Sequence, residues 1–302
     1  MDARQLQYFL AIVDHGNVHR AAQELYVAQP SLSQALAALE RDLGGLLFHR
    51  TGRRLVLTPS GEALVEPARQ VMRGLELARV TVEAVDGLQT GRLVIAAMPS
   101  QAVSPLTTLI SRFTACYPRV QVSVRAAATP SDIRALLRTG EAELGVVATL
   151  SGDTSVDDLV VHPLESQRFI LVAAGDADLP DSDPVEPADL VGHRLIVGQP
   201  GTGMRRAADA ILAVAAGSHA VIEIEHREAV LPLVLARVGV AVLSESWRQL
   251  AEASGTVTCD LNYDESLNVG LVHRPGRLSP AADAFLATAV GSETETSTSL
   301  ER

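Results

Sequence analysis

The feature that most constrains this chain is a set of apolar residues at helical spacing, followed at once by a basic turn. Four leucines recur in steps of four, three and four: Leu32, Leu36, Leu39 and Leu43. This spacing predicts one buried face of an amphipathic helix over residues 28–43. Three arginines then mark the bend of a predicted two-stranded turn: Arg50, Arg53 and Arg54. A pair of helices followed by a basic hairpin predicts a winged helix-turn-helix.

A helix-turn-helix places its second helix in the major groove of DNA. The polar residues of the 28–43 helix give the expected DNA contacts: Gln29, Pro30, Ser31, Ser33 and Gln34. Serine and glutamine side chains suit base edges and phosphates. The three arginines of the turn suit phosphates or the minor groove. Taken alone, the helix pair also fits a fold that touches no DNA, and the turn also fits a solvated surface.

The segment 17–62 contains three motifs in a fixed order: AAQELYVAQPSLS, then LERDLGGLLFHR, then LTPSG. In this it resembles the LysR-type transcriptional regulators, whose pattern is A-A-x-x-L-x-V-S-Q-P-A-L-S, L-E-x-x-L-G-x-x-L-F-x-R and L-T-x-A-G. Nearly every position matches, and a weaker resemblance continues to about residue 290. The departures that bear on capping and DNA contacts are Ala28, which stands for the family's usual Ser, His19 for Thr and Gln34 for Arg. Because these departures alter expected contacts, the family's half-site sequence does not carry over.

The first 60 residues are expected to form one α+β domain, the winged helix-turn-helix. Helices are predicted over 3–14 and 18–26, with Asn17 as the N-cap of the second. The hairpin is predicted over 46–57. If Ala28 is the N-cap of the 28–43 helix, that helix lacks a side-chain cap worth about 1 kcal/mol.

A long linker helix is predicted next, from an N-cap at Thr58 to about residue 88, with residues 61–90 as the dimerisation segment. Its apolar residues alternate in steps of four and three: Leu64, Ala68, Val71, Leu75, Ala78, Val82 and Val85. Such a heptad seam is typical of a coiled coil between two protomers. The alternative is a helix packed on its own domain. Pro67 predicts a kink, or a later start of the helix.

From residue 91 the pattern changes to short apolar strands alternating with helices. The predicted strands are 93–97, 120–124, 144–148, 169–173, 195–197, 221–224, 240–243 and 268–272. The predicted helices are 106–117, 131–139, 203–215, 228–238 and 280–290. This alternation predicts an α/β fold with mainly parallel sheets.

The residues alone leave open whether 91–291 forms one large domain or two lobes. The resemblance implies two lobes, like those of periplasmic solute-binding proteins, joined by two crossing strands. Lobe one would hold about 92–161 and 269–291, and lobe two about 162–268. The polar residues 292–302 predict a disordered tail.

Polar residues follow several of the predicted strands, where open α/β sheets bind ligands. The resemblance implies that four of them line an effector pocket: Ser100, Gln101, Thr129 and Thr202. Thr149, which follows the third strand, is a fifth candidate. Hydroxyl and amide donors near helix N-termini favour a small anionic organic effector. Each residue, taken singly, also fits a helix cap.

Composition limits the other function classes. The chain carries a net charge of −11, but residues 1–60 hold six arginines against five acidic residues, so the basic patch is local. Two cysteines make no disulfide framework, no apolar run approaches a membrane helix, and the N-terminus lacks an export signal, so we expect a cytoplasmic protein. Neither catalytic motifs nor metal-ligand spacing appear in the sequence, so no enzyme, cofactor or metal is expected.

The sequence therefore predicts a DNA-binding transcriptional regulator controlled by a small-molecule effector. Its expected partners are double-stranded DNA, the effector, and further copies of itself in a homodimer or homotetramer, with no membrane. The alternative is a solute-binding module or enzyme whose helix-turn-helix serves protein interaction.

Overall fold

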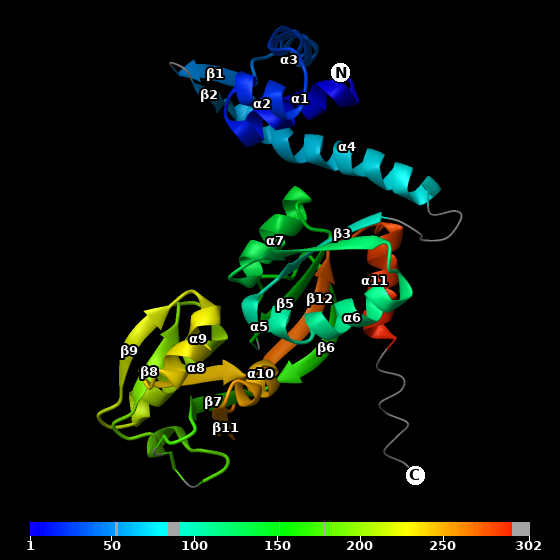
Figure 1. Cartoon of the computed structure of the whole chain (residues 1–302). Helices are drawn as coiled ribbons and strands as arrows, with labels where there is room; N and C mark the ends of the chain where they lie inside the picture. Colours follow the sequence, from blue (N-terminus) through cyan, green and yellow to red (C-terminus); the bar gives the residue numbers. More distant parts are fainter. Residues whose placement is uncertain (52–53, 84–90, 151, 178, 181, 292–302) are drawn as a thin grey trace. The chain divides into compact units, whose positions relative to one another are not determined.

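The computed structural model describes residues 1–51, 54–83, 91–150, 152–177, 179–180 and 182–291 (Figure 1). The predicted tail at 292–302 and the end of the predicted linker helix, with Val85, lie outside the described residues. The chain divides into two compact units, one formed by the first 87 residues and the other by most of the remainder. None of the described helices is both long and apolar enough to cross a membrane.

Three helices, a hairpin and a long helix make up the first unit. They are α1 (Ala3–His15), α2 (Val18–Glu24), α3 (Gln29–Leu43), β1 (Phe48–Thr51), β2 (Arg54–Leu57) and α4 (Pro59–Glu83). The strands β1 and β2 pair antiparallel. Phe9, Ile12, Leu32 and Leu39 are fully buried in the common core. This arrangement confirms the predicted winged helix-turn-helix fold.

Local signals in the sequence set the ends of these helices. The side chain of Asn17 accepts a hydrogen bond from the backbone N–H of Arg20 and caps α2, as predicted. Ala28 is the N-cap of α3 and provides no side-chain hydrogen bond. The prediction that Leu43 is buried is wrong. It is the last residue of α3, next to the C-cap Gly44, and is 44% exposed.

The start of α4 is fixed by Thr58, whose Oγ1 accepts a hydrogen bond from the N–H of Gly61 at 3.0 Å. Gly61 packs so closely that an added Cβ would lie 2.2 Å from the carbonyl oxygen of Leu47. The helix then continues through Pro67. The alternative of a later start is therefore wrong, because the cap and this close packing fix the first turn ahead of the proline.

The second unit contains two five-stranded sheets. In the first sheet the order is β4 (Val120–Ala126), β3 (Gly91–Ala97), β5 (Leu144–Thr149), β12 (Leu267–His273) and β6 (Val160–Gln167). In the second it is β11 (Thr256–Asp260), β7 (Phe169–Ala174), β10 (Val240–Ser244), β8 (Arg194–Gly198) and β9 (His219–Ile224). We call each sheet with its helices a lobe. The two-lobed α/β fold that the family resemblance implied is confirmed.

Helices cover both sheets. The first lobe contains α5 (Pro99–Val103), α6 (Leu106–Cys116), α7 (Pro130–Thr139) and α11 (Pro280–Val290). Phe113 of α6 meets Phe285 of α11 edge to face, with ring centroids 5.3 Å apart. The second lobe contains α8 (Gly203–Val214), α9 (Val230–Leu235), α10 (Arg248–Ala253) and the short turns η2 (Pro187–Asp189), η3 (Arg227–Ala229) and η4 (Glu245–Trp247).

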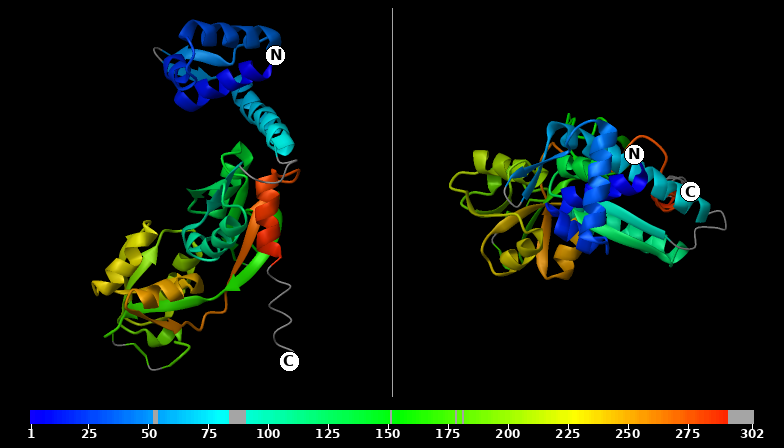
Figure 2. Two further views of the ribbon diagram at one scale, coloured as in Figure 1. Left: turned by 45° about the vertical axis from the view of Figure 1, so that its right-hand side comes forward. Right: turned by 90° about the horizontal axis from the view of Figure 1, so that it is seen from above.

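The prediction of mainly parallel sheets is wrong, because each sheet mixes two parallel and two antiparallel pairs. All eight predicted strands are present, but β6 and β11 were not predicted. In β6, polar residues interrupt the apolar alternation, and it bonds to β12 with a register shift. The strand β6 leads toward the second lobe and β12 brings the chain back, side by side and antiparallel (Figures 1 and 2).

Candidate DNA-binding and effector-binding sites

The side chains of α3 divide into a buried and an exposed face. Leu32 and Leu39 are fully buried beneath it. The predicted DNA contacts on this helix are all exposed: Gln29, Pro30, Ser31, Ser33 and Gln34. Across the described part of the chain, none of these five side chains makes a hydrogen bond or ion pair. The helix therefore presents a polar face that the fold itself does not use.

The basic turn lies between β1 and β2, where Thr51 is the partner of Arg54 across the hairpin. Arg50 lies in β1 and Arg54 in β2. Arg53 lies outside the described residues, and the side chains of Arg50 and Arg54 are not described either. Their contact with phosphates stays a prediction.

Sequence reasoning missed Tyr26, in the turn between α2 and α3. Its side chain is 96% exposed and its φ is 52°, a left-handed conformation that is uncommon for a bulky residue. Because Leu25 and Val27 flank it, hydrophobicity alone predicts burial there. An exposed tyrosine beside the start of α3 can donate its hydroxyl to a phosphate.

The apolar residues at heptad spacing along α4 are buried or half-buried in its first part and largely exposed in its second part. Its first part belongs to the core of the first unit, where Ala68 is buried and Leu64 is half-buried. Its later residues Val71, Leu75 and Val82 are 45%, 49% and 72% exposed. The first part thus packs on its own domain, whereas the second part is an apolar stripe that the described residues of this chain cover only in part.

In the first lobe, the predicted effector residues follow three neighbouring strands. Ser100 and Gln101 lie on α5 after β3, Thr129 follows β4, and Thr149 ends β5. The parallel pairs β3–β4 and β3–β5 bring these strand ends to one edge of the sheet. Thr129 exchanges hydrogen bonds with Asp132 in the first turn of α7. Thr149 donates to the carbonyl oxygen of Asn268 at 3.4 Å.

Ser100 and Gln101 are buried, with 8% and 1% of their surface exposed. Oγ of Ser100 accepts a hydrogen bond at 2.9 Å from the indole nitrogen of Trp247, in the η4 turn of the second lobe. Nε2 of Gln101 donates to Oε1 of Gln167 at 3.4 Å. Sequence reasoning missed Trp247, because nothing in its local pattern shows that it faces α5. These two predicted residues are therefore already bonded inside the protein.

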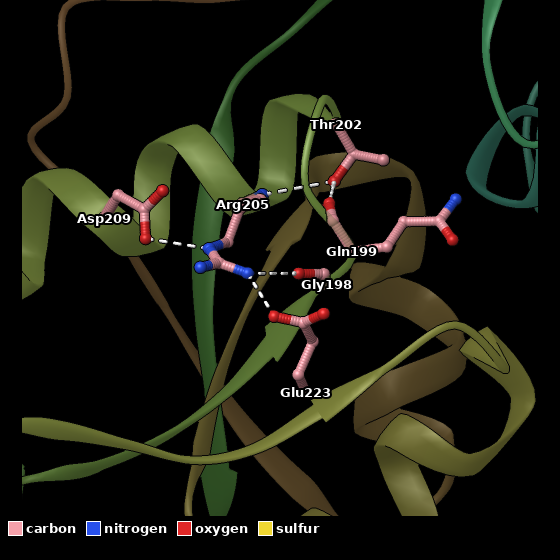
Figure 3. A network of polar contacts seen from close by, with 6 residues as sticks. All are labelled: Gly198, Gln199, Thr202, Arg205, Asp209 and Glu223. Carbon is pink, nitrogen blue, oxygen red and sulfur yellow. Dashed lines mark hydrogen bonds and ion pairs between the residues drawn. The ribbon is translucent and has the colours of Figure 1, made fainter.

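Thr202 follows β8 and is the N-cap of α8 (Figure 3). Its Oγ1 accepts from the N–H of Arg205 at 3.3 Å and donates to the carbonyl oxygen of Gln199 at 2.9 Å. A Cβ added to Gly203, the next residue, would lie 2.8 Å from Leu267 Cδ2. The start of α8 is therefore packed against β12, the strand that returns to the first lobe.

The two arginines that the sequence places near Thr202 both have carboxylate partners. Arg205 bonds to Asp209 at 2.8 Å and to Glu223 at 2.5 Å (Figure 3). These hydrogen bonds raise the pKa of Arg205 above its ordinary value. Arg206 bonds to Glu265 at 2.8 Å. Neither guanidinium is left for a ligand without giving up a partner.

A third arginine, Arg227, was missed by sequence reasoning. It opens the η3 turn after β9 and is 8% exposed. Its guanidinium lies beside Gly198 and Met204, next to the N-cap of α8. Burial lowers the pKa of Arg227 to about 10. No local signal in the sequence distinguishes it from a surface arginine.

A groove between the lobes does not include the five predicted effector residues. It has a volume of about 570 Å³ and is lined by Ser104 and Thr107 from the first lobe and Ser246 and Arg248 from the second, among others. Among the described residues, no hydrogen bond joins Thr202 to the four first-lobe candidates. Their convergence on one ligand stays a prediction.

Two family models match the chain. Residues 3–62 match the bacterial regulatory helix-turn-helix protein, lysR family, and residues 86–292 match the LysR substrate binding domain. The second match alone covers more than half of the chain. The chain belongs to the LysR family of bacterial helix-turn-helix regulators, and the predicted resemblance is confirmed. It is thus a DNA-binding transcriptional regulator with a substrate-binding domain, from a family of regulators rather than of enzymes.

The chain is similar to relatives along nearly its whole length. The HTH-type transcriptional regulator ClcR of Pseudomonas putida is 27% identical over 290 residues, 95% of this chain and 97% of ClcR. The hydrogen peroxide-inducible genes activator of Haemophilus influenzae is 26% identical over 302 residues, 97% of each chain.

Solved structures support the same fold. A full-length OxyR variant from Pseudomonas aeruginosa matches with a TM-score of 0.73 and 22% identity, over 96% of this chain and 94% of that one. Full-length CbnR in complex with its target DNA matches with a TM-score of 0.66 and 20% identity, over 97% of this chain and 100% of that one.

Proposed function

We propose that this protein reads a specific double-stranded DNA site by placing α3 in the major groove. The observation that carries this proposal is the exposed polar face of α3 above the buried Leu32 and Leu39. Gln29 and Ser33 would contact base edges, and Arg50, Arg53 and Arg54 would hold phosphates or reach the minor groove. A regulator of this kind acts where its DNA is, so we place it in the cytoplasm.

We further propose that α4 pairs two protomers through Val71, Leu75 and Val82. An exposed apolar stripe at heptad spacing favours a second helix of the same kind. Two DNA-binding units joined in this way would read half-sites about one helical turn, or a multiple, apart. Assembly as a homodimer or homotetramer follows from this pairing.

The proposed signal is a small anionic organic molecule bound between the two lobes, near Ser100, Gln101, Thr129, Thr149 and Thr202. The support is that these residues follow the carboxyl ends of strands, and that the start of α8 lies against a strand that joins the lobes. The effector would act by favouring one of two lobe arrangements, since a ligand shifts only states that it binds unequally. Calorimetry with pairs of carboxylates and their matching amides tests whether the effector is an anion. Binding of only neutral or cationic molecules would contradict this proposal.

A gel-shift experiment tests DNA recognition. The purified protein is mixed with DNA from just upstream of its own gene at two salt concentrations, with competitor DNA present. We expect a shift that survives competitor and weakens steeply with salt, because phosphate contacts release counterions. Arg53→Ala should weaken binding to all sequences, whereas Gln29→Ala should relax base preference. Equal losses on every sequence for both variants would contradict this division of roles.

A further inference from the structure

Arg227 carries a buried charge that nothing in the described part of the chain neutralises. It is 8% exposed, and the hydrogen bond that it makes there is donated by Nη1 to Sδ of Met204. A thioether is a weak acceptor without charge. With a pKa of about 10, Arg227 remains protonated at neutral pH. A buried cation without a partner is costly, and a bound anion removes that cost.

The carboxylates nearby are bonded elsewhere. Glu223, on the strand before η3, bonds to Arg205. Glu228, the residue after Arg227, is exposed and pairs with His226 at 3.1 Å. Neither forms an ion pair with Arg227. Three arginines thus surround the start of α8, and only Arg227 lacks a carboxylate among the described residues.

The guanidinium of Arg227 lies beside a glycine and close to other hydrogen-bond donors. A Cβ on Gly198 would stand 3.2 Å from Nη2 of Arg227 and 3.3 Å from Oγ1 of Thr202. Since Gly198 has no side chain, one small group in that place could touch both. The N–H groups of Gly203 and Met204, at the first two positions of the 12-residue α8, have no acceptor among the described residues. The positive end of the helix dipole adds to the attraction for an anion.

We propose that Arg227 is the residue that binds a carboxylate group of the effector, with Thr202 and the first N–H groups of α8 as further donors. The planar guanidinium offers two parallel N–H groups, which match the two oxygens of a carboxylate. This inference rests on the proposed function in placing the effector beside α8. It adds the chemical class, a carboxylic acid, and the residue that selects it.

Thermal unfolding of the full-length protein tests the inference, with acetate as the probe. Acetate carries a carboxylate group on a single methyl group, so it probes the proposed carboxylate contact apart from the rest of the effector. In wild type, sodium acetate at constant ionic strength should raise Tm saturably, by roughly 3 °C at ten times Kd. Acetamide, the neutral match, should leave Tm unchanged, and phosphate should raise it less than acetate does.

Three variants locate the effect. Arg227→Met should abolish the acetate shift, and Arg227→Lys should reduce it, because lysine keeps the charge but lacks the planar pair of donors. Gly198→Ala should reduce it as well, since its Cβ fills the proposed space. Arg206→Met is the matched control, because it removes one arginine already paired with Glu265, and it should keep the wild-type shift.

The inference is overturned if acetate leaves the Tm of wild type unchanged, or if Arg227→Met keeps the full shift. A larger shift with phosphate than with acetate would also overturn it, in favour of a phosphate site. The gel shift described above reports on DNA binding separately. A protein that binds DNA without an acetate effect contradicts this inference alone, whereas an acetate effect through Arg227 without any DNA shift contradicts the DNA-binding proposal alone.

Discussion

In the first lobe, Ser100 and Gln101 are buried and bonded to Trp247 and Gln167, whereas in the second lobe Arg227 is buried beside a thioether. All three are polar residues at strand ends, where ligands bind in open α/β sheets. The first two already have protein partners that satisfy them, and the third does not. Residue type at a strand end therefore does not distinguish a side chain that already has protein partners from one that still lacks a charged partner.

The largest expected effect concerns Trp247, which is 5% exposed. Trp247→Ala should lower the free energy of unfolding by about 3–5 kcal/mol, because it leaves a large cavity next to Ser100. Trp247→Phe keeps most of the volume and removes the hydrogen bond, so it should cost about 1 kcal/mol. Chemical denaturation of both variants measures the difference. Equal losses of stability in the two variants would mean that the hydrogen bond to Ser100, rather than the packing of the indole ring, accounts for the contribution of Trp247.

A second prediction concerns Gly203, the first residue of α8, which packs against Leu267 of β12. Gly203→Ala should destabilise the protein by about 1–3 kcal/mol, because the new Cβ would stand 2.8 Å from Leu267 Cδ2. Gly74→Ala is the control, since it lies within α4 with no atom within 4 Å of its Cβ position. It should stabilise by about 0.5–1 kcal/mol. The midpoints of denaturant unfolding of both variants measure these changes in stability. Stabilisation by both substitutions would show that α8 can shift away from Leu267 at little cost.

Substitutions at the N-caps of α8 and α3 should change stability in opposite directions. Thr202→Ala should cost about 1 kcal/mol, because it removes the cap of α8, and Ala28→Ser should gain a similar amount by adding a cap to α3. Thermal unfolding of each variant gives the sign. A loss for Thr202→Ala far above that of a cap would indicate a further structural role for this hydroxyl.

The smallest effect is expected at the crossing strands, where Nε2 of His162 and Nε2 of His273 are 3.1 Å apart. Burial and the neighbouring His273 lower the pKa of His162. The unfolded state therefore binds more protons just below pH 6.5, so stability falls as pH decreases through that range. His162→Gln should reduce this pH dependence by less than about 1 kcal/mol between pH 7 and 5. Parallel denaturation curves at the two pH values measure it, and an unchanged slope would contradict the prediction.

The sequence predicted what depends on local spacing and missed what depends on distant contacts. The buried Leu32 and Leu39 of α3, the cap at Thr58 and the eight strands predicted for the second unit follow from periodicity and turn chemistry. The strand β6 was missed, because His162 and Pro163 break its apolar pattern and its pairing with β12 joins segments far apart in the chain. The burial of Arg227 was missed for the same reason, since the residues that cover it belong to β8 and α8. The proposed domain limits and ligand contacts stay predictions.

The pairing of β6 with β12 extends to Gln167 opposite Leu267, close to where Phe169 begins β7. Two strands bonded along their length form a ribbon that resists stretching and lengthwise sliding but bends and twists readily. A ribbon of this kind acts as a hinge, which keeps the two lobes at a fixed separation while one rotates relative to the other. Closure around a ligand would therefore reach the far side of each lobe as a rotation, which is amplified with distance from the pivot. A displacement too small to disturb packing near Leu267 can still swing a distant surface through a much longer arc.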